Sequence, residues 1–570
     1  MAEEVWMLQT KKADFKQIGA RFRIDPVTAR IIRNRGIEGE AAIDRYLNGT
    51  LDDLYDPMLL KDMEHAVSIL CEAVDTGKKI RIVGDYDIDG VCSTYILLQA
   101  FERLGSDVDF EIPDRIKDGY GINESIIEQA HADGVEVILT CDNGISAFHQ
   151  VELAKKYGMT VVITDHHEVP LDGEKEKIPP ADAVIDPKQA DCPYPFPEIC
   201  GAVVAYKLVQ VLYARRGVPQ MEWLDLLEFA AIATVGDVMK LQDENRILVK
   251  YGLKKMAQTK NLGLRRLAEK NNLDLGAITA YHIGFVIGPC LNAGGRLKTA
   301  KEALALLRAQ SEEEAERLAE ELKELNDTRK DMTERGTEAA KLQVESWYQK
   351  DKVLVVFLPE CHESLAGIIA GRLREYYQKP AIVLTRGEEA VKGSGRSIDE
   401  YHMFKKLTEV SDLLLKFGGH PLAAGLSLEE KNIDEFRRRL NENAGLTEED
   451  FKAKVWIDVP MPVGYVTERL VRELSCLEPF GQGNEKPLFA EKSLRIRASR
   501  VLGRNRNVVK MTLEETDGHA IEALYFGDGT AFEEERAGRR EIDVVYYPDI
   551  NEYNGRKTLQ AVIRRYKFRG

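Results

Sequence analysis

Short apolar segments alternate with longer amphipathic stretches from about residue 79 onward. Four of these segments, KIRIVGDYD, VDFEIPD, VEVILTCDNG and TVVITDHH, are separated by stretches of helical character such as VCSTYILLQAFERLG and ESIIEQAHADG. Strands that alternate with helices indicate a parallel sheet with right-handed crossovers. The pattern therefore predicts an α/β domain, and ligands are expected where its strands end.

The rest of the chain divides by the same reasoning. Strong helix formers with dense charge predict one long connecting helix over 301–347, whose charges form a solvated face. A second, smaller α/β unit is expected over 348–453, opening at VLVVFLP, and short strands with polar turns predict a β-barrel over 454–570. Residues 1–50 carry no motif and are expected to form a helical lead-in, which leaves 51–300 for the first α/β domain.

Length and composition narrow the class of protein. A chain of 570 residues is too long for one core, and its 44% hydrophobic content is typical of globular domains. No apolar run reaches the roughly 18 to 20 residues of a membrane span, and the N-terminus lacks the apolar segment of a secretory signal. We therefore expect a cytoplasmic protein that does not engage a membrane.

The eight cysteines are scattered and form no C-x-x-C pair. This spacing argues against a zinc cluster and against a disulfide framework, and favours reduced thiols.

The net charge of −16 argues at first against a nucleic-acid ligand, because phosphate backbones are held by lysine and arginine. The charge is unevenly distributed, however. Residues 492–570 hold 16 Lys and Arg against 12 Asp and Glu, a balance of +4 that leaves −20 on the first 491 residues. A local basic surface matters more for binding than the total charge does, so the barrel stays a candidate nucleic-acid domain.

Three aspartates, Asp85, Asp87 and Asp89, alternate in GDYDIDG directly after an apolar segment. If that segment is extended, alternate side chains face the same way, and the three carboxylates repel one another unless a cation lies between them. The alternative is an ordinary turn rich in Asp and Gly.

Further segments favour the cation site over the turn. Asp142 in LTCDNG, the run Asp165, His166 and His167 in VVITDHH, and Asp237 in ATVGDVM each follow an apolar segment, and we count these positions as strand ends of one sheet. Helices are expected at 201–215 and 223–239, and the second of these ranges also contains Asp237. Carboxylates with one or two imidazoles and no thiolate favour Mn²⁺ or Mg²⁺. Two such ions can activate a water and neutralise charge on a phosphoryl group, so the pattern indicates phosphoester hydrolysis.

Two glycine-rich segments mark the second α/β unit as a phosphate-binding domain. Glycines in KGSGRS (392–397) and GGHPLAAG (418–425) allow backbone N–H groups to approach an anion, while Arg396 and His420 supply charge and donors. GGH by itself is equally well explained as a turn.

The motifs GDYDIDG, TCDNG, TDHH and GDVM, in this order, resemble those of the DHH phosphoesterase superfamily. The resemblance implies that Asp87 and Asp142 hold one divalent cation, and that Asp89, Asp142, His166 and Asp237 hold a second. It places Asp85 and His167 beside the water or the phosphate, and gives Asp165 the role of supporting a histidine. Val83 stands where some branches carry a histidine ligand, and this departure concerns the first ion.

Within this superfamily the chain resembles the bacterial single-strand-specific 5′-to-3′ DNA exonucleases, from about residue 50 to the end. The similar segments are IPDRIKDGYGIN, IGPCLNAGGRL, KGSGRS, GGHPLAAG and LEPFGQGNEKPLF. Cys290 and Cys361 depart from the residues common in that branch. The resemblance implies a DHHA1-like second domain that closes over the substrate, and a substrate-binding set of Arg296, His362, Arg372, Gly393, Ser394, Gly395, Arg396, Gly418, Gly419 and His420.

The barrel resembles the oligonucleotide-binding (OB) fold of the same branch. An OB fold grips a single strand with a basic groove and stacking aromatics. The candidates that we single out from the basic patch are Arg495, Arg497 and Arg556.

The resemblance implies a monomeric enzyme of recombination and repair that releases mononucleotides from single-stranded DNA, and it suggests a RecQ-type helicase and a single-strand-binding protein as partners. One alternative is a relative that hydrolyses short oligonucleotides, cyclic dinucleotides or polyphosphate, against which the basic barrel argues. The other is a catalytically silent DNA-binding scaffold, which would be expected to have lost metal ligands that this chain retains.

Overall fold

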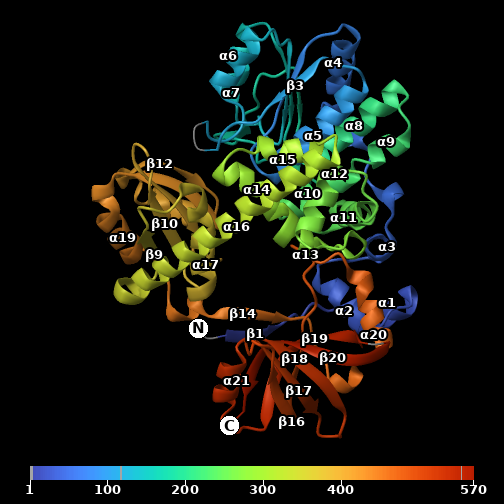
Figure 1. The fold of residues 1–570 in the computed structure, drawn as a ribbon, viewed down its shortest axis with the longest axis vertical. Helices are drawn as coiled ribbons and strands as arrows, with labels where there is room; N and C mark the ends of the chain where they lie inside the picture. Colours follow the sequence, from blue (N-terminus) through green and yellow to red (C-terminus); the bar gives the residue numbers. More distant parts are fainter. Residues whose placement is uncertain (1–3, 116–117, 554, 570) are drawn as a thin grey trace. The chain divides into compact units, whose positions relative to one another are not determined.

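A five-stranded parallel sheet, ordered β3-β2-β4-β5-β8, forms the centre of the first α/β domain in the computed structural model (Figure 1). Its strands are β2 (Ile80–Val83), β3 (Val108–Glu111), β4 (Val137–Cys141), β5 (Thr160–Thr164) and β8 (Ala183–Ile185). Strands β2 and β4 are buried along their whole length, as expected for strands covered on both faces, and this burial explains their continuous apolar runs. The predicted parallel sheet is confirmed.

Helices cover both faces of this sheet. Helices α6 (Glu124–Ala132) and α7 (Phe148–Lys156) share a core with one face, while α4 (Met63–Asp75), α5 (Ile88–Arg103) and α8 (Gly201–Arg216) contact the other. A short hairpin, β6 (Leu171–Asp172) with β7 (Lys175–Glu176), follows β5. The crossovers bring the carboxyl ends of β2, β4 and β5 to one edge, where the acidic motifs lie.

A helical region follows the sheet. Helix α10 (Leu227–Gly236) packs against α5 and α8 and is preceded by the short α9 (Gln220–Leu224). The chain continues through α11 (Asp243–Met256), α12 (Leu262–Lys270), α13 (Ala280–His282), a π-helical turn (Ile283–Ile287), α14 (Gly288–Leu297) and α15 (Lys301–Arg308).

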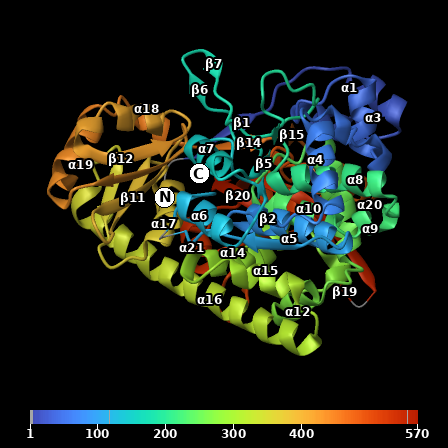
Figure 2. The same ribbon diagram turned by 90° about the horizontal axis from the view of Figure 1, so that it is seen from above.

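Helix α16 (Glu312–Gln343) is a single helix of 32 residues that runs from beside α12 to beside α17 (Figure 2). Ser311 caps it by accepting a hydrogen bond from the N–H of Glu314, and three glutamates occupy its first turn, where the helix dipole favours negative charge. The helix begins after α15, so the expected connecting segment holds two helices and ends in a π-helical turn (Val344–Tyr348).

The second α/β domain is built on a mixed sheet ordered β12-β13-β11-β10-β9. Its strands are β9 (Leu354–Phe357), β10 (Ala381–Arg386), β11 (Val391–Arg396), β12 (Leu414–Gly419) and β13 (Ala423–Leu428), and only β9 and β10 pair in parallel. Helix α17 (Ala366–Tyr377) packs on the face turned to α16, and α19 (Ile433–Glu442) packs on the other, near the short α18 (Met403–Thr408).

The structure describes residues 4–115, 118–553 and 555–569, which fall into two compact units. The first unit holds both α/β domains (54–239 and 247–453), and the second holds 4–53, 240–246 and 454–570. Within the described residues, no helix combines the length and the apolar character that crossing a bilayer requires.

The second unit contains a six-stranded sheet of β15 (Val459–Pro460), β16 (Phe489–Leu502), β17 (Val508–Glu514), β18 (Ala520–Phe526), β19 (Glu541–Tyr553) and β20 (Arg556–Phe568). Pairing of β16 with β19 closes the five strands from β16 to β20 into a barrel, and β15 pairs with β16 outside that ring. Helix α21 (Gly529–Arg536) lies between β18 and β19, and α20 (Glu468–Leu474) precedes β16. The N-terminal residues, expected as a helical lead-in, hold β1 (Glu4–Leu8), paired with β14 (Ala453–Ile457), and helices α1 (Phe15–Phe22), α2 (Pro26–Asn34) and α3 (Glu40–Asn48). Ile31, Ile32 and Tyr46 join the barrel core, so this segment is part of the second unit.

Candidate metal centre and phosphate pocket

The segment GDYDIDG leaves β2 and immediately becomes the first turn of α5. Asp87 is the N-cap, and its carboxylate accepts hydrogen bonds from the N–H groups of Asp89 and Gly90 at 3.0 and 3.1 Å. Asp89 already lies inside the helix. The expectation that the three aspartates share one extended segment is therefore wrong, because the chain turns into a helix at Ile88. Asp85 and Asp87 therefore join one group of candidate metal ligands, and Asp89 joins another.

The other candidate ligands come from three more elements. Asp142 follows β4 in the left-handed region (φ 62°), which aspartate tolerates better than most residues, and Asp165, His166 and His167 follow β5. Asp237 caps the C-terminal end of α10, which confirms the helix expected over 223–239, whereas the expectation that Asp237 follows a strand of the sheet is wrong. The sequence of α10 is mainly apolar and buried, and periodicity alone does not distinguish such a helix from a buried strand.

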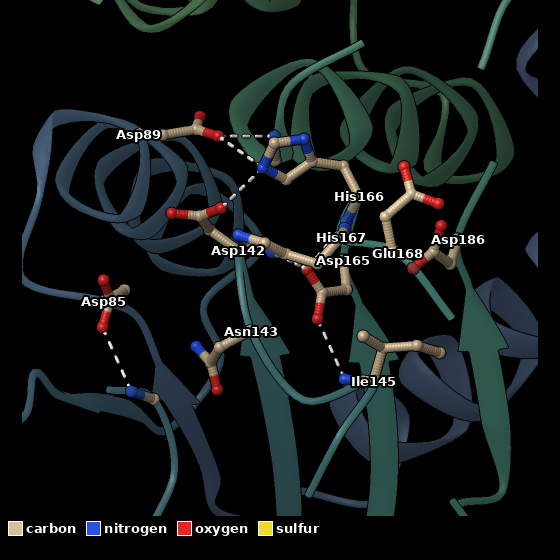
Figure 3. A network of polar contacts seen from close by, with 12 residues as sticks. Asp85, Asp89, Asp142, Asn143, Ile145, Asp165, His166, His167, Glu168 and Asp186 are labelled. Atoms are coloured by element: carbon tan, nitrogen blue, oxygen red, sulfur yellow. Dashed lines mark hydrogen bonds and ion pairs between the residues drawn. The ribbon is translucent and has the colours of Figure 1, made fainter. Parts of the chain in front are cut away.

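Oxygen and nitrogen atoms of these residues converge. Ligand atoms of Asp85, Asp87 and Asp142 lie within 4.8 Å of one another, as do those of Asp89, His166 and Asp237. His166 Nε2 lies 3.1 Å from Asp142 Oδ1, 3.4 Å from Asp89 Oδ2 and 3.9 Å from Asp237 Oδ2. Figure 3 shows the carboxylates of Asp89 and Asp142 directed at this ring. Asp142 thus stands between the two groups.

The cluster has the polarity that divalent cations require. Asp85, Asp89 and Asp142 are each at most 2% exposed. Asp85 Oδ2, Asp142 Oδ1 and His166 Nδ1 are buried and have no hydrogen-bond partner among the described residues. Buried carboxylate oxygens without donors are costly unless a cation neutralises them, and oxygen donors with one imidazole match Mn²⁺ or Mg²⁺. The residues present therefore fit a pair of divalent cations.

Burial and mutual repulsion disturb the protonation of these groups. Burial, followed by the charge of Asp89, raises the pKa of Asp142 well above its usual range and that of Asp237 to about 8. Burial lowers the pKa of His166, which keeps the imidazole in the neutral form that binds metals. Burial also opposes charge on His167, but its hydrogen bond to Asp165 and the charges of Asp165, Asp237 and Asp89 together outweigh this and raise the pKa of His167 to about 9.

Neighbouring backbone groups hold two of the aspartates in place. The N–H groups of Gly201 and Ala202, at the start of α8, donate to the two oxygens of Asp89, each at 2.7 Å. A Cβ on Gly201 would lie 2.7 Å from the Cβ of Asp142, so only glycine allows this approach. Asp165 accepts from the N–H of Ile145 at 2.9 Å and lies 2.7 Å from Nδ1 of His167.

Two residues that the sequence interpretation did not single out support the cluster. The Tyr120 hydroxyl donates to the backbone carbonyl of Asp142 at 2.6 Å and lies 3.1 Å from the ring nitrogens of His167. Asn143 donates to the carbonyl of Val83 and accepts from the N–H of Ile122, which ties β2 to the loop after β3. Tyr120 lies in IPDRIKDGYGIN, a segment recognised only by resemblance, so no physical signal in the sequence pointed to it.

A second feature, here called the phosphate pocket, is a cavity of about 550 Å³ within the first unit. Four of the residues that the resemblance assigns to substrate binding line it: Arg296, Gly393, Ser394 and Arg396. Arg296 donates to the carbonyl of Ser364 at 3.1 Å, and Arg396 donates to Ser394 Oγ at 3.2 Å. Burial, with the nearby charge of Arg115, lowers the pKa of Arg296 to about 10. Tyr86, between two of the candidate metal ligands, also lines the pocket.

The remaining predicted substrate residues lie elsewhere. His362 lies beside the pocket, where its Nδ1 is 2.8 Å from Ser364 Oγ. Gly395 lies within β11 and faces the Met403 side chain. Gly418, Gly419 and His420 are exposed at the β12–β13 turn and do not line the pocket. Arg372 lines a separate groove between α16 and α17.

Arg495, Arg497 and Arg556 are exposed on the barrel strands of the second unit. Arg497 Nε lies 3.1 Å from Glu514 Oε2, so part of the predicted basic patch is neutralised locally.

Three family profiles match the chain: the DHH family N-terminal domain over residues 79–234, the DHHA1 domain over 350–445, and the RecJ OB domain over 457–565. The single-stranded-DNA-specific exonuclease RecJ of Bacillus subtilis is 36% identical over 98% of this chain and 70% of the relative. The enzyme of the same name from Escherichia coli is 34% identical over 95% of both chains.

Two solved structures are also similar. RecJ from Thermus thermophilus in complex with Mn²⁺ is 28% identical, with a TM-score of 0.84 over 99% of this chain and 80% of that one. A second structure, an exonuclease RecJ bound to manganese, is 32% identical, with a TM-score of 0.60 over 69% of this chain and 98% of that one.

Proposed function

The chain belongs to the RecJ family of single-stranded-DNA-specific exonucleases, and from this premise we propose that it removes mononucleotides from the 5′ end of single-stranded DNA. It is a metal-dependent nuclease of DNA recombination and repair that uses Mn²⁺ or Mg²⁺. The observation that carries the proposal is the convergence of Asp89, Asp142, His166 and Asp237 on one another at the edge of the sheet.

The proposed roles follow the two groups of ligands. Asp87 and Asp142, with Asp85 beside them, would hold one cation, and Asp89, Asp142, His166 and Asp237 would hold the other. Such a pair of cations, when bound, lowers the pKa of a water and neutralises charge on the phosphoryl group. Most of the ligands are buried, which excludes competing water and strengthens each electrostatic contact.

The remaining residues orient the substrate. His167 lies beside the ligand groups and can donate a hydrogen bond to a phosphate oxygen. Asp165 and Tyr120 fix the orientation of that ring. Arg396, Arg296 and Ser394 would bind the terminal 5′ phosphate in the phosphate pocket, which sets the direction of degradation.

Further expectations belong to this proposal. The proposed domain limits are 51–300 for the DHH domain, 301–347 for the connecting segment, 348–453 for the DHHA1-like domain and 454–570 for the OB fold. The OB fold would contribute Arg495, Arg497 and Arg556 to DNA binding. We expect a monomer acting in the cytoplasm with a RecQ-type helicase and a single-strand-binding protein. His362, Arg372, His420 and the glycines of 418–419 would contact DNA farther from the scissile bond.

One experiment tests the activity directly. Purified protein with Mn²⁺ is incubated with 5′-labelled single-stranded DNA, the matching duplex, a cyclic dinucleotide and polyphosphate. Labelled mononucleotide released from the single strand alone supports the proposal. Release of label first as longer fragments, or hydrolysis of the cyclic dinucleotide or polyphosphate in preference to DNA, contradicts it.

A further inference from the structure

Two large aromatic side chains of the first unit stack on each other in solvent. Tyr281, in α13, is 64% exposed, and Phe285, in the π-helical turn that follows, is 67% exposed. Their ring centres are 4.7 Å apart and their planes are inclined by 27°. We call this pair the aromatic platform. Burial of such rings is strongly favourable, and π-helical turns are frequent at functional sites, so the platform is a candidate binding surface.

The aromatic platform belongs to the same continuous helical segment as Arg296. Helix α13, the π-helical turn and α14 follow one another without a break over 280–297. Phe285 precedes Arg296 by eleven residues, close to three helical turns, so the two side chains lie on one face. Ile283 and Ile287, on the opposite face, are buried. The platform and the phosphate pocket, which Arg296 lines, therefore lie on the same side of this segment, about 16 Å apart along its axis.

The C-terminal part of this helical segment lies against the loop that carries metal ligands. A Cβ on Gly295 would be 2.3 Å from the carbonyl oxygen of Tyr86, and a Cβ on Gly288 would be 3.3 Å from the side chain of Ile88. Tyr86 and Ile88 alternate with the three aspartates of GDYDIDG. The helical segment therefore runs directly beside the proposed metal centre.

The aromatic platform lies beyond the metal ligands when the segment is followed from the phosphate pocket. Gly284, next to Phe285, is close to Val235, because a Cβ on this glycine would be 3.7 Å from a Val235 side-chain carbon. Val235 lies in the last turn of α10, two residues before Asp237. The order along the segment is therefore phosphate pocket, metal ligands, platform. A strand with its terminal phosphate in the pocket would reach the platform within a few nucleotides.

We propose that the aromatic platform stacks a base of the single strand a few nucleotides from its 5′ end, and thereby holds the strand across the metal centre. Every base has a flat aromatic face, so this contact is tolerant of sequence. The bases of a duplex are stacked on one another, so their faces are not free to cover the platform. The platform is a further contact for the proposed substrate, and the choice of DNA as its ligand rests on the proposed function.

DNA binding by the inactive Asp142→Ala variant tests the proposal. Fluorescence anisotropy is measured with an intact 5′-phosphorylated oligonucleotide, and with oligonucleotides that carry one abasic nucleotide at successive positions from the 5′ end. Removing the base at one position, a few nucleotides from the end, should weaken binding about tenfold, as expected for the loss of a base stacked on an aromatic side chain. Abasic nucleotides at neighbouring positions should have a smaller effect.

A second substitution in the same background identifies the partner of that base. Phe285→Ala should weaken binding of the intact strand about tenfold and remove the sensitivity to the abasic position, because both changes delete one contact. Phe285→Tyr, which keeps a ring, should retain both. Tyr157→Ala is the matched control and should change nothing. This exposed ring stacks on His131 at 4.2 Å, but it lies just before β5, where the strands of the sheet begin, opposite the edge with the metal ligands.

Three outcomes would overturn the proposal: no binding of the intact strand, binding that Phe285→Ala leaves unchanged, or weaker binding of every oligonucleotide with the same sensitivity to the abasic position. The last outcome would assign Phe285 a role in folding alone. A wild-type protein that fails to degrade single-stranded DNA would refute the proposed function instead. Coupling between Phe285 and one abasic position does not depend on cleavage, so the two failures can be told apart.

Discussion

At the scale of single residues, the metal centre depends on groups that are costly to bury alone. Asp142 belongs to the group of Asp85 and Asp87, lies 3.1 Å from His166 of the other group, and is 2% exposed. Its neighbours, His166 and the backbone of Gly201, lie at contact distance from its side chain. The fold tolerates this arrangement because cations are expected to neutralise the carboxylates.

Asp142→Ala should abolish turnover, a loss of at least about a thousandfold, because both cations lose a ligand. Binding of single-stranded DNA should persist, since the proposed contacts to DNA lie on other residues. Nuclease rate and DNA affinity, measured on the same preparation, check this. Asp172→Ala, at an exposed position, is the control. An equal loss of DNA binding in Asp142→Ala would assign Asp142 a folding role.

Glu228 predicts a pH dependence of stability. Burial raises the pKa of Glu228 to about 7 from its ordinary value of 4.5, so between these values the folded state binds more protons than the unfolded state. Stability from this group is present below pH 4.5 and is lost as pH rises through 7. Glu228→Gln removes this loss. The free energy of unfolding of the variant minus that of the wild type should therefore be larger at pH 8 than at pH 4.5, by up to about 3 kcal/mol.

Denaturant melts at both pH values measure this difference. Glu152→Gln, on an exposed face of α7, is the control and should shift neither value. A difference between Glu228→Gln and the wild type that does not change with pH would show that Glu228 is not buried in its neutral form.

At the scale of elements, the ends of helices and strands hold most of the proposed site residues in place. The first turns of α5 and α8 supply the N–H groups that hold Asp87 and Asp89, and β11 presents Ser394 and Arg396, two residues apart, to the same pocket. Residues two apart on a strand share a face, which explains why KGSGRS places both on one side.

Arg396→Met should reduce the preference for a 5′ phosphate. The guanidinium is one of the charged donors in the phosphate pocket that we assign to the terminal phosphate, and a charge-assisted hydrogen bond contributes about 1.5 to 3 kcal/mol. We expect KM for 5′-phosphorylated DNA to rise about tenfold or more, and KM for 5′-hydroxyl DNA to change little. Arg386→Met, whose guanidinium pairs with Glu430 elsewhere on the domain, is the control. An equal rise for both substrates would assign Arg396 to the DNA backbone.

The sequence predicted some of these elements correctly and others not. The strands β2, β4 and β5 and the motifs at their ends were predicted correctly, because buried parallel strands have a distinctive apolar pattern. Asp237 was assigned to a strand, although it caps α10, because a short buried helix and a buried strand have the same composition. The predicted phosphate residues are divided between the pocket, the β12–β13 turn and the α16–α17 groove, since glycine-rich turns give no signal of which cavity they face.

At the scale of the whole molecule, the second unit is assembled from three separated segments of chain. Arg246, from the middle segment, is 2% exposed and donates to the carbonyls of Tyr46, Cys476 and Leu477 at 2.8 to 3.1 Å. Its guanidinium also lies 4.0 Å from the ring centre of Tyr46. One side chain thus joins the N-terminal helices, the middle segment and the region before the barrel.

Arg246→Ala should destabilise the second unit by about 3 kcal/mol or more, because the buried guanidinium's hydrogen bonds to three carbonyl groups and its contact with the Tyr46 ring are lost. Limited proteolysis should then cleave within 4–53 or 454–570 before the first unit. Arg438→Ala removes a guanidinium that pairs only on the exposed surface of α19 and should leave the proteolysis pattern unchanged. Cleavage of the first unit at the same rate as the second in Arg246→Ala would show that the two units unfold together.

The sequence by itself determined the α/β and barrel domains, the chemical type of the metal ligands and their order, because apolar periodicity and side-chain chemistry are local properties. Only the tertiary structure decided which carboxylates face one another, that the N-terminal segment belongs to the barrel unit, and that Tyr120, Arg246 and Glu228 lie where they do. Those facts depend on contacts between residues far apart in the chain, whose distances are set by the packing of whole elements.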